Sequence, residues 1–236
     1  CSADAVMAKE KLALVLSGGG ARGAAHIGVL RALEQQHIKP DVIVGTSMGA
    51  IIGALYASGL SSADIEEHLA NTSLAGGFND QIPRDQLSVR QKHQRDKFPI
   101  KIDMGVSNGS LTMPLGLVQG QNVRKILRQM IPTRVRQFQH TQIPLVTVAT
   151  DLATGEAVYF DQGPLIPAVH ASMAIPGIYA PVAIDQRLLV DGGLSDNMPI
   201  KKAYELGATF VIAVNIGSQL HQKEDITSAF TVMDQL

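Results

Sequence analysis

The protein has 236 residues, 45% of them hydrophobic, which is enough for one large domain with a substantial core. Its formal net charge is only −1, which argues against a nucleic-acid binder, since such proteins concentrate basic residues on one face. No apolar run approaches the roughly 18 residues that span a bilayer, so we expect a soluble protein that can still touch a membrane surface.

Both ends of the sequence are expected to lie outside the folded domain. Residues 1–10 form a flexible lead-in, and the single cysteine, Cys1, leaves no partner for an internal disulfide. A chain that begins Cys-Ser is either a lipoprotein modified at Cys1 or a piece of a longer protein. We favour the piece, because residues 218–236 have apolar residues at helical spacing but no cap, which predicts a truncated helix.

Short apolar runs alternate with amphipathic stretches between residues 11 and 217. Strands are expected at 12–16, 41–44, 145–149, 157–160, 187–190 and 210–214, and helices at 24–36, 50–57, 62–70, 121–131, 165–173 and 199–206. This alternation predicts an α/β fold whose mainly parallel central sheet is flanked by helices. Residues 78–121 are less regular, and we interpret them as an insert over the core.

A G-x-S-x-G pentapeptide occupies residues 45–49. It follows the second predicted strand and precedes a helix, 50–57, that is rich in small residues. Strand, sharp turn and helix in that order are typical of a nucleophile elbow, in which a tight turn pushes the serine hydroxyl, here Ser47, into the site. Gly45 and Gly49 would leave room for backbone to pass closely. The alternative is a glycine-rich turn with an incidental serine.

A second glycine-rich segment, residues 18–23 with the sequence Gly-Gly-Gly-Ala-Arg-Gly, follows the first predicted strand. In a parallel sheet this glycine loop falls at the same carboxyl edge as the elbow. Gly18, Gly19 and Gly20 would present backbone N–H groups to a developing negative charge, as an oxyanion hole must. Arg22 would add positive charge or hold the loop in shape.

The same loop also fits G-x-G-x-x-G, so a dinucleotide-binding domain is the rival interpretation. That fingerprint needs an acidic residue at the end of the second strand to hold the ribose. Asp41 instead starts that strand, which ends in Gly-Thr-Ser. The loop also lacks the Lys-Ser or Lys-Thr of a phosphate-binding P-loop, and we find no metal-ligand motif.

A serine hydroxyl needs a base to take its proton. The sequence has seven histidines, but only His221 follows Asp191, as the usual hydrolase order requires, and no predicted strand places it at the sheet edge. Asp191 ends a predicted strand, and Gly192 and Gly193 allow a tight turn beside it. Burial would raise the pKa of this carboxyl above its ordinary value of about 3.9 and make it a stronger base. The alternative is that Asp191 only organises a turn.

Together, these three motifs resemble the patatin-like phospholipases over residues 11 to about 217. Two further stretches strengthen the match: Ala149-Thr150-Asp151-Leu152-Ala153-Thr154-Gly155 and Ala171-Ser172-Met173-Ala174-Ile175-Pro176-Gly177. The resemblance implies a three-layer α/β/α catalytic domain that hydrolyses lipid acyl esters through a Ser–Asp dyad, without a catalytic histidine or a cofactor. Ser47 is then the nucleophile, Asp191 the base and the glycine loop the oxyanion hole. Asp151 is expected to have a structural role in a turn.

The insert and the ends also resemble a bacterial subgroup in which a patatin-like domain is exported ahead of an outer-membrane barrel. This resemblance implies a secreted or cell-surface protein, with a cytoplasmic location as the alternative. The expected partner is a phospholipid or another acyl-ester lipid, with transient contact to a membrane surface and no nucleic acid. A homodimer is the default expectation for the oligomeric state.

Three groups of side chains are candidates for contact with lipid. They are Leu111, Met113, Leu115, Leu117 and Val118; Ile175, Ile178, Tyr179 and Val182; and the basic Arg84, Arg90, Lys92, Arg95, Lys97 and Lys101. The alternatives are ordinary core for the apolar groups and a solvated face for the basic one. A general carboxylesterase or thioesterase would share every catalytic residue and differ only in its acyl groove. A regulatory nucleotide-binding domain would keep the loop without turnover.

Overall fold

The computed structural model describes residues 10–72, 105–107, 110–112, 116–118 and 120–217. The elements in chain order are β1 Leu12–Leu16, α1 Ala24–Gln35, β2 Val42–Thr46, α2 Met48–Ala57, α3 Ser62–Asn71, β3 Gly105–Ser107, β4 Ser110–Thr112, β5 Gly116–Val118, α6 Gln121–Met130, β6 Leu145–Asp151, β7 Ala157–Phe160, α7 Leu165–Ser172, β8 Gly177–Tyr179, β9 Val182–Ile184, β10 Arg187–Asp191, α8 Gly193–Asp196, α9 Ile200–Glu205 and β11 Phe210–Val214. The expected lead-in, most of the expected insert and the expected C-terminal helix lie outside the described residues. All the elements predicted within the described part are present, with ends within two residues of those predicted.

The central sheet has the strand order β11-β1-β2-β6-β10-β9, with β7 paired to the other edge of β6. Neighbours from β11 to β6 are parallel, whereas β10 runs antiparallel to both β6 and β9, and β7 runs antiparallel to β6. The predicted α/β class, a central sheet flanked by helices, is confirmed. The sheet itself is mixed, because the part of β6 that extends beyond β2 pairs with β10.

Strands β2 and β10 lie along the same edge of β6 and point toward each other. Thr46, the last residue of β2, pairs with Val148 of β6, and Asp191, the last residue of β10, pairs with the next residue, Ala149. The opposite edge of β6 is occupied by β7 over the same stretch. The carboxyl ends of the two strands therefore meet, and this brings Ser47 and Asp191 together although they are far apart in the sequence.

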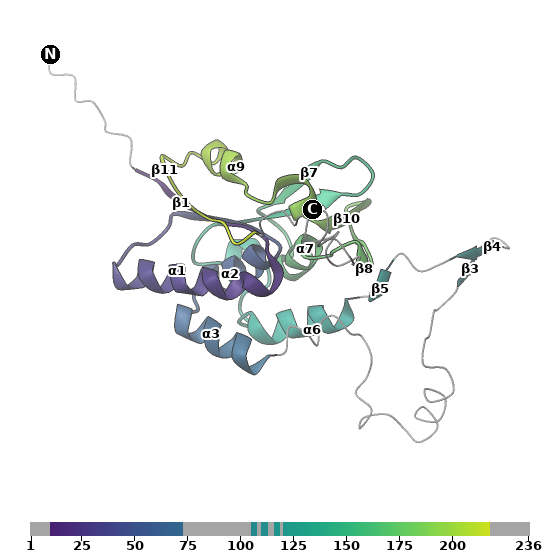
Figure 1. Ribbon diagram of the computed structural model, residues 1–236, viewed down its shortest axis with the longest axis horizontal. Coiled ribbons are helices and arrows are strands. Elements are labelled where there is room, and N and C mark those ends of the chain that lie inside the picture. The colour runs from purple at the N-terminus through teal and green to yellow at the C-terminus, as the bar shows by residue number, and fades with distance from the viewer. Residues whose placement is uncertain (1–9, 73–104, 108–109, 113–115, 119, 218–236) are drawn as a thin grey trace, which may run out of the picture.

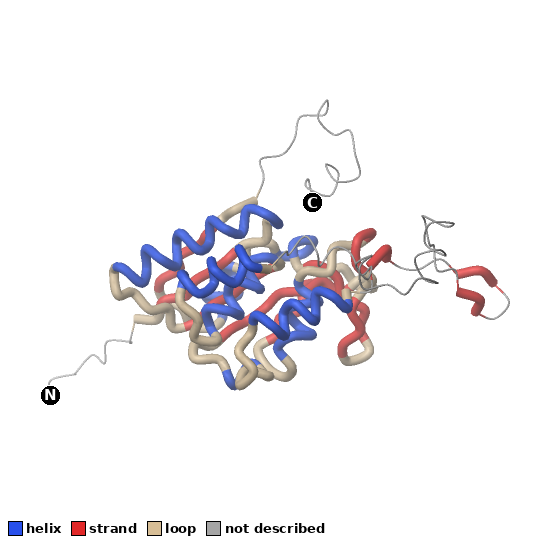
Figure 2. Tube along the Cα trace, turned by 90° about the horizontal axis from the view of Figure 1, so that it is seen from below, coloured by secondary structure: helices blue, strands red, loops and turns tan. Residues whose placement is uncertain are grey.

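Side chains of each strand alternate between the two faces of the sheet, and both faces are buried. The larger core packs under α1, α2, α3, α6 and α7 and takes Leu14, Leu16, Ile43 and Leu145 from the strands. The smaller core takes Ala13, Val15, Val42, Val44 and Val146 from the strands and packs against α9. Figure 1 shows α1, α2, α3 and α6 below the sheet and α9 above it, and Figure 2 shows helices along the strands from a second direction.

The helices that cover the larger core are short relative to a bilayer. In the part of the chain that the structure describes, no helix combines the length and the apolar character needed to cross a membrane. The start of α3 illustrates how local chemistry sets its bounds. The Asp64 N–H donates to the Ser61 hydroxyl at 3.2 Å, and the Asp64 carboxylate accepts the Ser61 N–H at 2.9 Å, so the two residues form a capping box.

Candidate active site

Ser47 lies in the turn between β2 and α2, where the strand ends and the helix begins. Its backbone has φ 53° and ψ −116°, a left-handed conformation that costs a non-glycine residue about 1–3 kcal/mol. The Ser47 hydroxyl donates a hydrogen bond to Oδ2 of Asp191 at 2.7 Å. The Ser47 N–H donates to the hydroxyl of Ser172, a buried residue at the end of α7, at 2.9 Å. The turn therefore directs the serine side chain at the carboxylate.

Gly45 and Gly49 are both required by the tightness of this turn. A Cβ on Gly45 would lie 2.5 Å from the Gly49 carbonyl oxygen, and a Cβ on Gly49 would collide with the backbone carbonyl of Leu16. Strand β1, the elbow and helix α2 thus approach each other through backbone alone. The structure has the close backbone approach predicted for the two glycines.

Asp191 is held at the end of β10 by bonds to both its backbone and its side chain. Its N–H donates to the Ala174 carbonyl at 2.9 Å, and its carbonyl accepts the Thr150 hydroxyl at 2.8 Å. Its Oδ1 accepts the Gly193 N–H at 2.8 Å. Asp191 is 8% exposed, and its burial raises the pKa of the carboxyl to about 6, against the opposing effect of the hydrogen bonds from Ser47 and Gly193.

The two glycines after Asp191 serve the turn in different ways. A Cβ on Gly192 would collide with the Val148 carbonyl of β6, so this position needs a glycine for packing. Gly193 provides the backbone N–H that holds the Asp191 carboxylate. The turn predicted beside the base therefore exists, and it both orients the carboxylate and lets α8 start directly against β6.

The glycine loop borders the Ser47–Asp191 pair. A Cβ on Gly18 would lie 3.0 Å from the Ser47 Cβ, so the two segments are in contact at the carboxyl ends of β1 and β2. Gly19 and Gly20 have φ angles of 158° and 54°, and the Arg22 N–H closes the loop onto the Gly19 carbonyl at 3.2 Å. Among the described residues, nothing accepts a hydrogen bond from the N–H of Gly19 or Gly20.

No histidine in the described part of the chain hydrogen-bonds to Ser47 or Asp191. Buried His26 bonds through Nε2 to the Ser17 carbonyl at 2.9 Å, and burial lowers its pKa. Buried His170 packs edge-on against Tyr179, with 6.3 Å between ring centres. His221, the one candidate for a triad from sequence order, lies outside the described residues.

Asp41 and Asp151, the two other aspartates discussed from the sequence, both accept hydrogen bonds from backbone N–H groups. The Asp41 carboxylate accepts the Leu12 N–H at 2.8 Å, at the start of the strands and away from the glycine loop. It is therefore not at the strand end where a ribose-binding carboxylate would stand. Asp151 Oδ1 accepts the Ala153 N–H at 2.9 Å, and Oδ2 lies 3.8 Å from Arg187 Nε. Asp151 thus closes a turn, the structural role expected for it.

The three groups of side chains predicted to contact lipid differ in where they lie. Tyr179 and Val182 are buried in the larger core, and Ile175 and Ile178 pack against it, which favours the alternative of ordinary core. The basic stretch, Met113 and Leu115 lie outside the described residues. In the described part of the chain, no group of His, Cys, Asp and Glu side chains is arranged to hold a metal ion.

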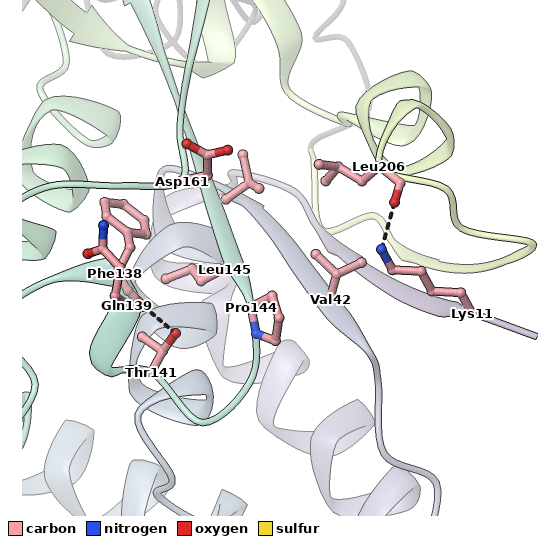
Figure 3. Close-up of a pocket in the computed structure, with 10 residues that line it drawn as sticks. Lys11, Val42, Phe138, Gln139, Thr141, Pro144, Leu145, Asp161 and Leu206 are labelled. Atoms are coloured by element: carbon pink, nitrogen blue, oxygen red, sulfur yellow. Dashed lines mark hydrogen bonds between the residues drawn. The ribbon is translucent and has the colours of Figure 1, made fainter. Parts of the chain in front are cut away.

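A hollow of about 340 Å³ lies at the opposite edge of the sheet, where β2 and β6 begin. Figure 3 shows its floor of Val42, Pro144 and Leu145, with Asp161 and Lys11 toward its sides. The Lys11 ammonium group donates to the Leu206 carbonyl at 2.6 Å. The hollow is separated from Ser47 by the length of β2, so it takes no part in the candidate active site.

Four side chains that hold the site were not among the predicted site residues: Ser172, Asn197, Thr150 and Ser195. Ser172 and Thr150 lie in the two stretches already noted for the resemblance, and the other two directly follow the turn at 191–193. Asn197 Oδ1 accepts the Gly18 N–H at 2.9 Å, and Ser195 and Thr150 join their hydroxyls at 2.8 Å. Their closeness in sequence to the motifs is the feature that could have pointed to a role in the site.

A strained serine at a strand–helix turn, bonded to a buried carboxylate beside free main-chain amides, is the arrangement that acyl transfer by a serine requires. The family described as patatin-like phospholipase matches residues 14–204, and this chain belongs to that family. Membership supports hydrolysis of lipid esters as its general class of activity.

The relatives are longer than this chain. An uncharacterised NTE family protein of Mycobacterium tuberculosis is 34% identical over 217 residues, covering 91% of this chain and 52% of the relative. Human patatin-like phospholipase domain-containing protein 6 is 31% identical over 216 residues, covering 91% of this chain and 14% of that protein. The crystal structure of VipD from Legionella pneumophila aligns with a TM-score of 0.45 and 19% identity, covering 81% of this chain and 47% of that one.

The chain thus spans about half the length of the mycobacterial relative. Nothing in the names of these relatives supports the expected export ahead of an outer-membrane barrel, and the second resemblance gains no support from them. The secreted location, the homodimer and the division of the chain at residues 10 and 217 stay predictions.

Proposed function

We propose that this chain is a serine lipid acyl hydrolase of the phospholipase A type, which cleaves fatty acyl esters through a Ser47–Asp191 dyad. The observation that carries the proposal is the 2.7 Å hydrogen bond from the Ser47 hydroxyl to Asp191 Oδ2. A serine hydroxyl becomes a useful nucleophile only when a positioned base can take its proton. The buried carboxylate, with its pKa raised to about 6, is such a base at neutral pH.

The reaction proceeds in two halves. Asp191 takes the Ser47 proton as Oγ attacks the ester carbonyl carbon, and the carbonyl π electrons move onto oxygen. The N–H groups of Gly19 and Gly20 stabilise this oxyanion, since the Gly18 N–H already donates to Asn197. The tetrahedral intermediate collapses, the protonated Asp191 gives its proton to the leaving alkoxide, and an acyl-Ser47 remains. Water, deprotonated by Asp191, then attacks the acyl group, and as the bond to Ser47 Oγ breaks Asp191 gives that proton to Oγ, which releases the fatty acid and restores the dyad.

Two features of the described residues favour a dyad over the other interpretations. A triad would need a histidine bonded to the serine, and none of the described histidines is. A dinucleotide site would need a carboxylate at the end of β2, whereas Asp41 binds backbone at its start. A general carboxylesterase or thioesterase uses the same atoms and is distinguished only by its substrate.

Covalent labelling with a fluorophosphonate probe tests the dyad. We expect Ser47→Ala to abolish labelling and Asp191→Asn to slow it by about 10⁴-fold, as in other enzymes that lose the carboxylate of the serine machinery. Ser58→Ala is the matched control, because Ser58 is a buried serine at the end of α2 whose hydroxyl donates to the Ala54 carbonyl and not to the dyad. Equal labelling of Ser47→Ala and the unmodified protein would reject the proposal.

The pH dependence of labelling is a second test of the same dyad. The base acts in its ionised form, so the labelling rate should fall as pH drops below about 6, where the Asp191 carboxyl becomes protonated. If His221 were the base instead, labelling would be lost in His221→Ala to an extent comparable to the loss in Asp191→Asn. Fatty acid release from phosphatidylcholine vesicles, compared with hydrolysis of p-nitrophenyl butyrate, then distinguishes a phospholipase from a short-chain esterase.

A further inference from the structure

Asn197 joins the glycine loop to the turn that carries the candidate base. It directly follows α8, and its Oδ1 accepts the Gly18 N–H at 2.9 Å, between segments 179 residues apart in the sequence. The bond is made by a side chain and not by the sheet, because β1 ends at Leu16, before Gly18. The position of Gly18 relative to the dyad therefore depends on this amide.

The surroundings of the Asn197 oxygen place it between the parts of the site. A Cβ on Gly18 would lie 2.6 Å from this oxygen and 3.0 Å from the Ser47 Cβ. A Cβ on Gly193 would lie 3.3 Å from the same oxygen and 3.1 Å from Asp191 Oδ1. One oxygen atom is thus close to the glycine loop, to the elbow and to the turn at the base. A side chain at position 18 would collide with this oxygen, and one at position 193 would crowd it.

The rest of the loop has few bonds of its own. Within the described residues, the Ser17 N–H donates to the Val214 carbonyl at 3.1 Å, the Ser17 carbonyl bonds to His26 Nε2 at 2.9 Å, and Gly20–Gly23 form a 3-10 turn in which the Arg22 N–H donates to the Gly19 carbonyl at 3.2 Å. The Arg22 bond holds the peptide plane shared by the Gly19 carbonyl and the Gly20 N–H, whereas no bond among the described residues holds the Gly18 carbonyl, which shares its plane with the Gly19 N–H. Glycine backbone is free to rotate, and donors that must reorient during the reaction stabilise an oxyanion poorly.

We infer that Asn197 is the positioning residue of the oxyanion hole: by holding the Gly18 N–H, it sets the direction of the Gly19 N–H, beside the Gly20 N–H that the Arg22 bond already holds. The inference rests on the proposed function of the same site. Asn197 acts through Gly18 and does not touch the substrate. An amide suits this role better than a carboxylate, because it accepts the bond without placing a second negative charge beside Asp191.

Two substitutions at Asn197 distinguish the effect of losing the hydrogen-bond acceptor from the effect of adding a negative charge. Asn197→Ala removes the acceptor, so we expect kcat for p-nitrophenyl butyrate to fall on the order of 10- to 100-fold, less than the loss of a donor itself, with little change in KM. The pH at which kcat of Asn197→Ala falls to half on the acid side should be the same as in the unmodified protein. Asn197→Asp keeps an acceptor but adds charge, so it should retain more of kcat at high pH and move the acid limb to higher pH.

Thr154→Ala is the matched control. Thr154 is an exposed residue whose side chain likewise accepts a backbone N–H, that of Glu156 at 3.2 Å, but in the turn between β6 and β7. It should keep kcat and the pH profile. An unchanged kcat in Asn197→Ala, or an equal loss in Thr154→Ala, would overturn the inference. Failure of the proposed function has a different signature, since labelling would then survive in Ser47→Ala.

Hydrogen exchange tests the positioning without any assay of activity. In Asn197→Ala, a peptide covering residues 17–22 should exchange its amide hydrogens faster than in the unmodified protein, while a peptide from α7 should be unchanged. Thr154→Ala should leave both peptides unchanged. Unaltered exchange of residues 17–22 in Asn197→Ala would refute the positioning role whatever reaction the site performs. Equal melting temperatures of the variants, within a few degrees, show that the comparison is made between folded proteins.

Discussion

The Ser47–Asp191 pair is carried by strands, whereas the glycine loop beside it is carried by the side chain of Asn197. On the first side, Thr46 and Asp191 take their positions from neighbouring residues of β6, and bonds from Ala174 and Thr150 hold the Asp191 backbone. On the second side, the Gly18 N–H has a side-chain partner, and Gly19 and Gly20 lie beyond the end of β1.

This difference matches what each half has to do in the proposed reaction. Proton transfer requires the two oxygen atoms to stay at hydrogen-bond distance, and paired strands provide that rigidity. The loop has to approach an ester carbonyl that enters from outside, and backbone without side chains leaves room for it. Segments with few internal bonds open more readily than paired strands. Substitutions on the two sides should therefore differ in how they affect stability.

The largest expected effect comes from adding one methyl group on each side. Gly49→Ala places a Cβ against the backbone carbonyl of Leu16, which cannot move without displacing β1 from α2, so we expect a loss of about 3 kcal/mol or more. Gly20→Ala meets no atom within 4 Å and suffers only from its φ of 54°, a cost of about 1 kcal/mol. Urea unfolding of the two variants measures both values, and equal losses would contradict the contrast.

The second prediction concerns the cost of keeping Asp191 buried. Its folded pKa is raised from 3.8 to about 6, so the folded protein binds the proton more tightly than the unfolded chain. The free energy of unfolding is then highest below pH 4, falls as pH rises through about 6, and is constant above that with respect to this group. At about 1.4 kcal/mol per pKa unit, the loss is roughly 3 kcal/mol.

Asp191→Asn removes this cost and keeps atoms that can bond to Gly193 and Ser47. We expect the variant to be more stable than the unmodified protein by up to about 3 kcal/mol at pH 8 and to have little advantage at pH 4. Urea unfolding at the two pH values measures the difference. A variant that gains the same stability at both pH values would show that the effect does not arise from the charge of Asp191.

The strand-held side was also the side that the sequence predicted well. The runs before Ser47 and Asp191 are continuous apolar strands, and the helices between them have a clear period, so their bounds could be read within two residues. Strand ends followed by glycines then indicated where the reactive side chains stand. Elements such as β8, β9 and α8 were missed, because a stretch of three or four residues is too short to show a period.

The contacts that complete the site could not be read in the same way. Strand β10 can pair antiparallel with β6 only because β6 is long enough to pair with both β2 and β10 along one edge. The spacing of apolar residues within a strand does not show which strand it pairs with. The bonds from Ser47 to Ser172 and from Gly18 to Asn197 join residues 125 and 179 positions apart. Serine and asparagine occur in many turns, so neither residue type identifies such a partner by itself.

The smallest expected effect tests whether the elbow stores strain on the rigid side of the site. Ser47 has φ 53° and ψ −116°, where a Cβ is unfavourable and glycine is not. Both Ser47→Ala and Ser47→Gly remove the hydroxyl, so their difference reports on the backbone alone. We expect the glycine variant to be the more stable of the two by about 1 kcal/mol in urea unfolding. The matched control is Ala32→Gly on the exposed face of α1, where the same change should instead destabilise by about 1 kcal/mol. A loss of stability at both positions would mean that the turn at Ser47 relaxes without its side chain and that the serine is held by its contacts rather than by a strained backbone.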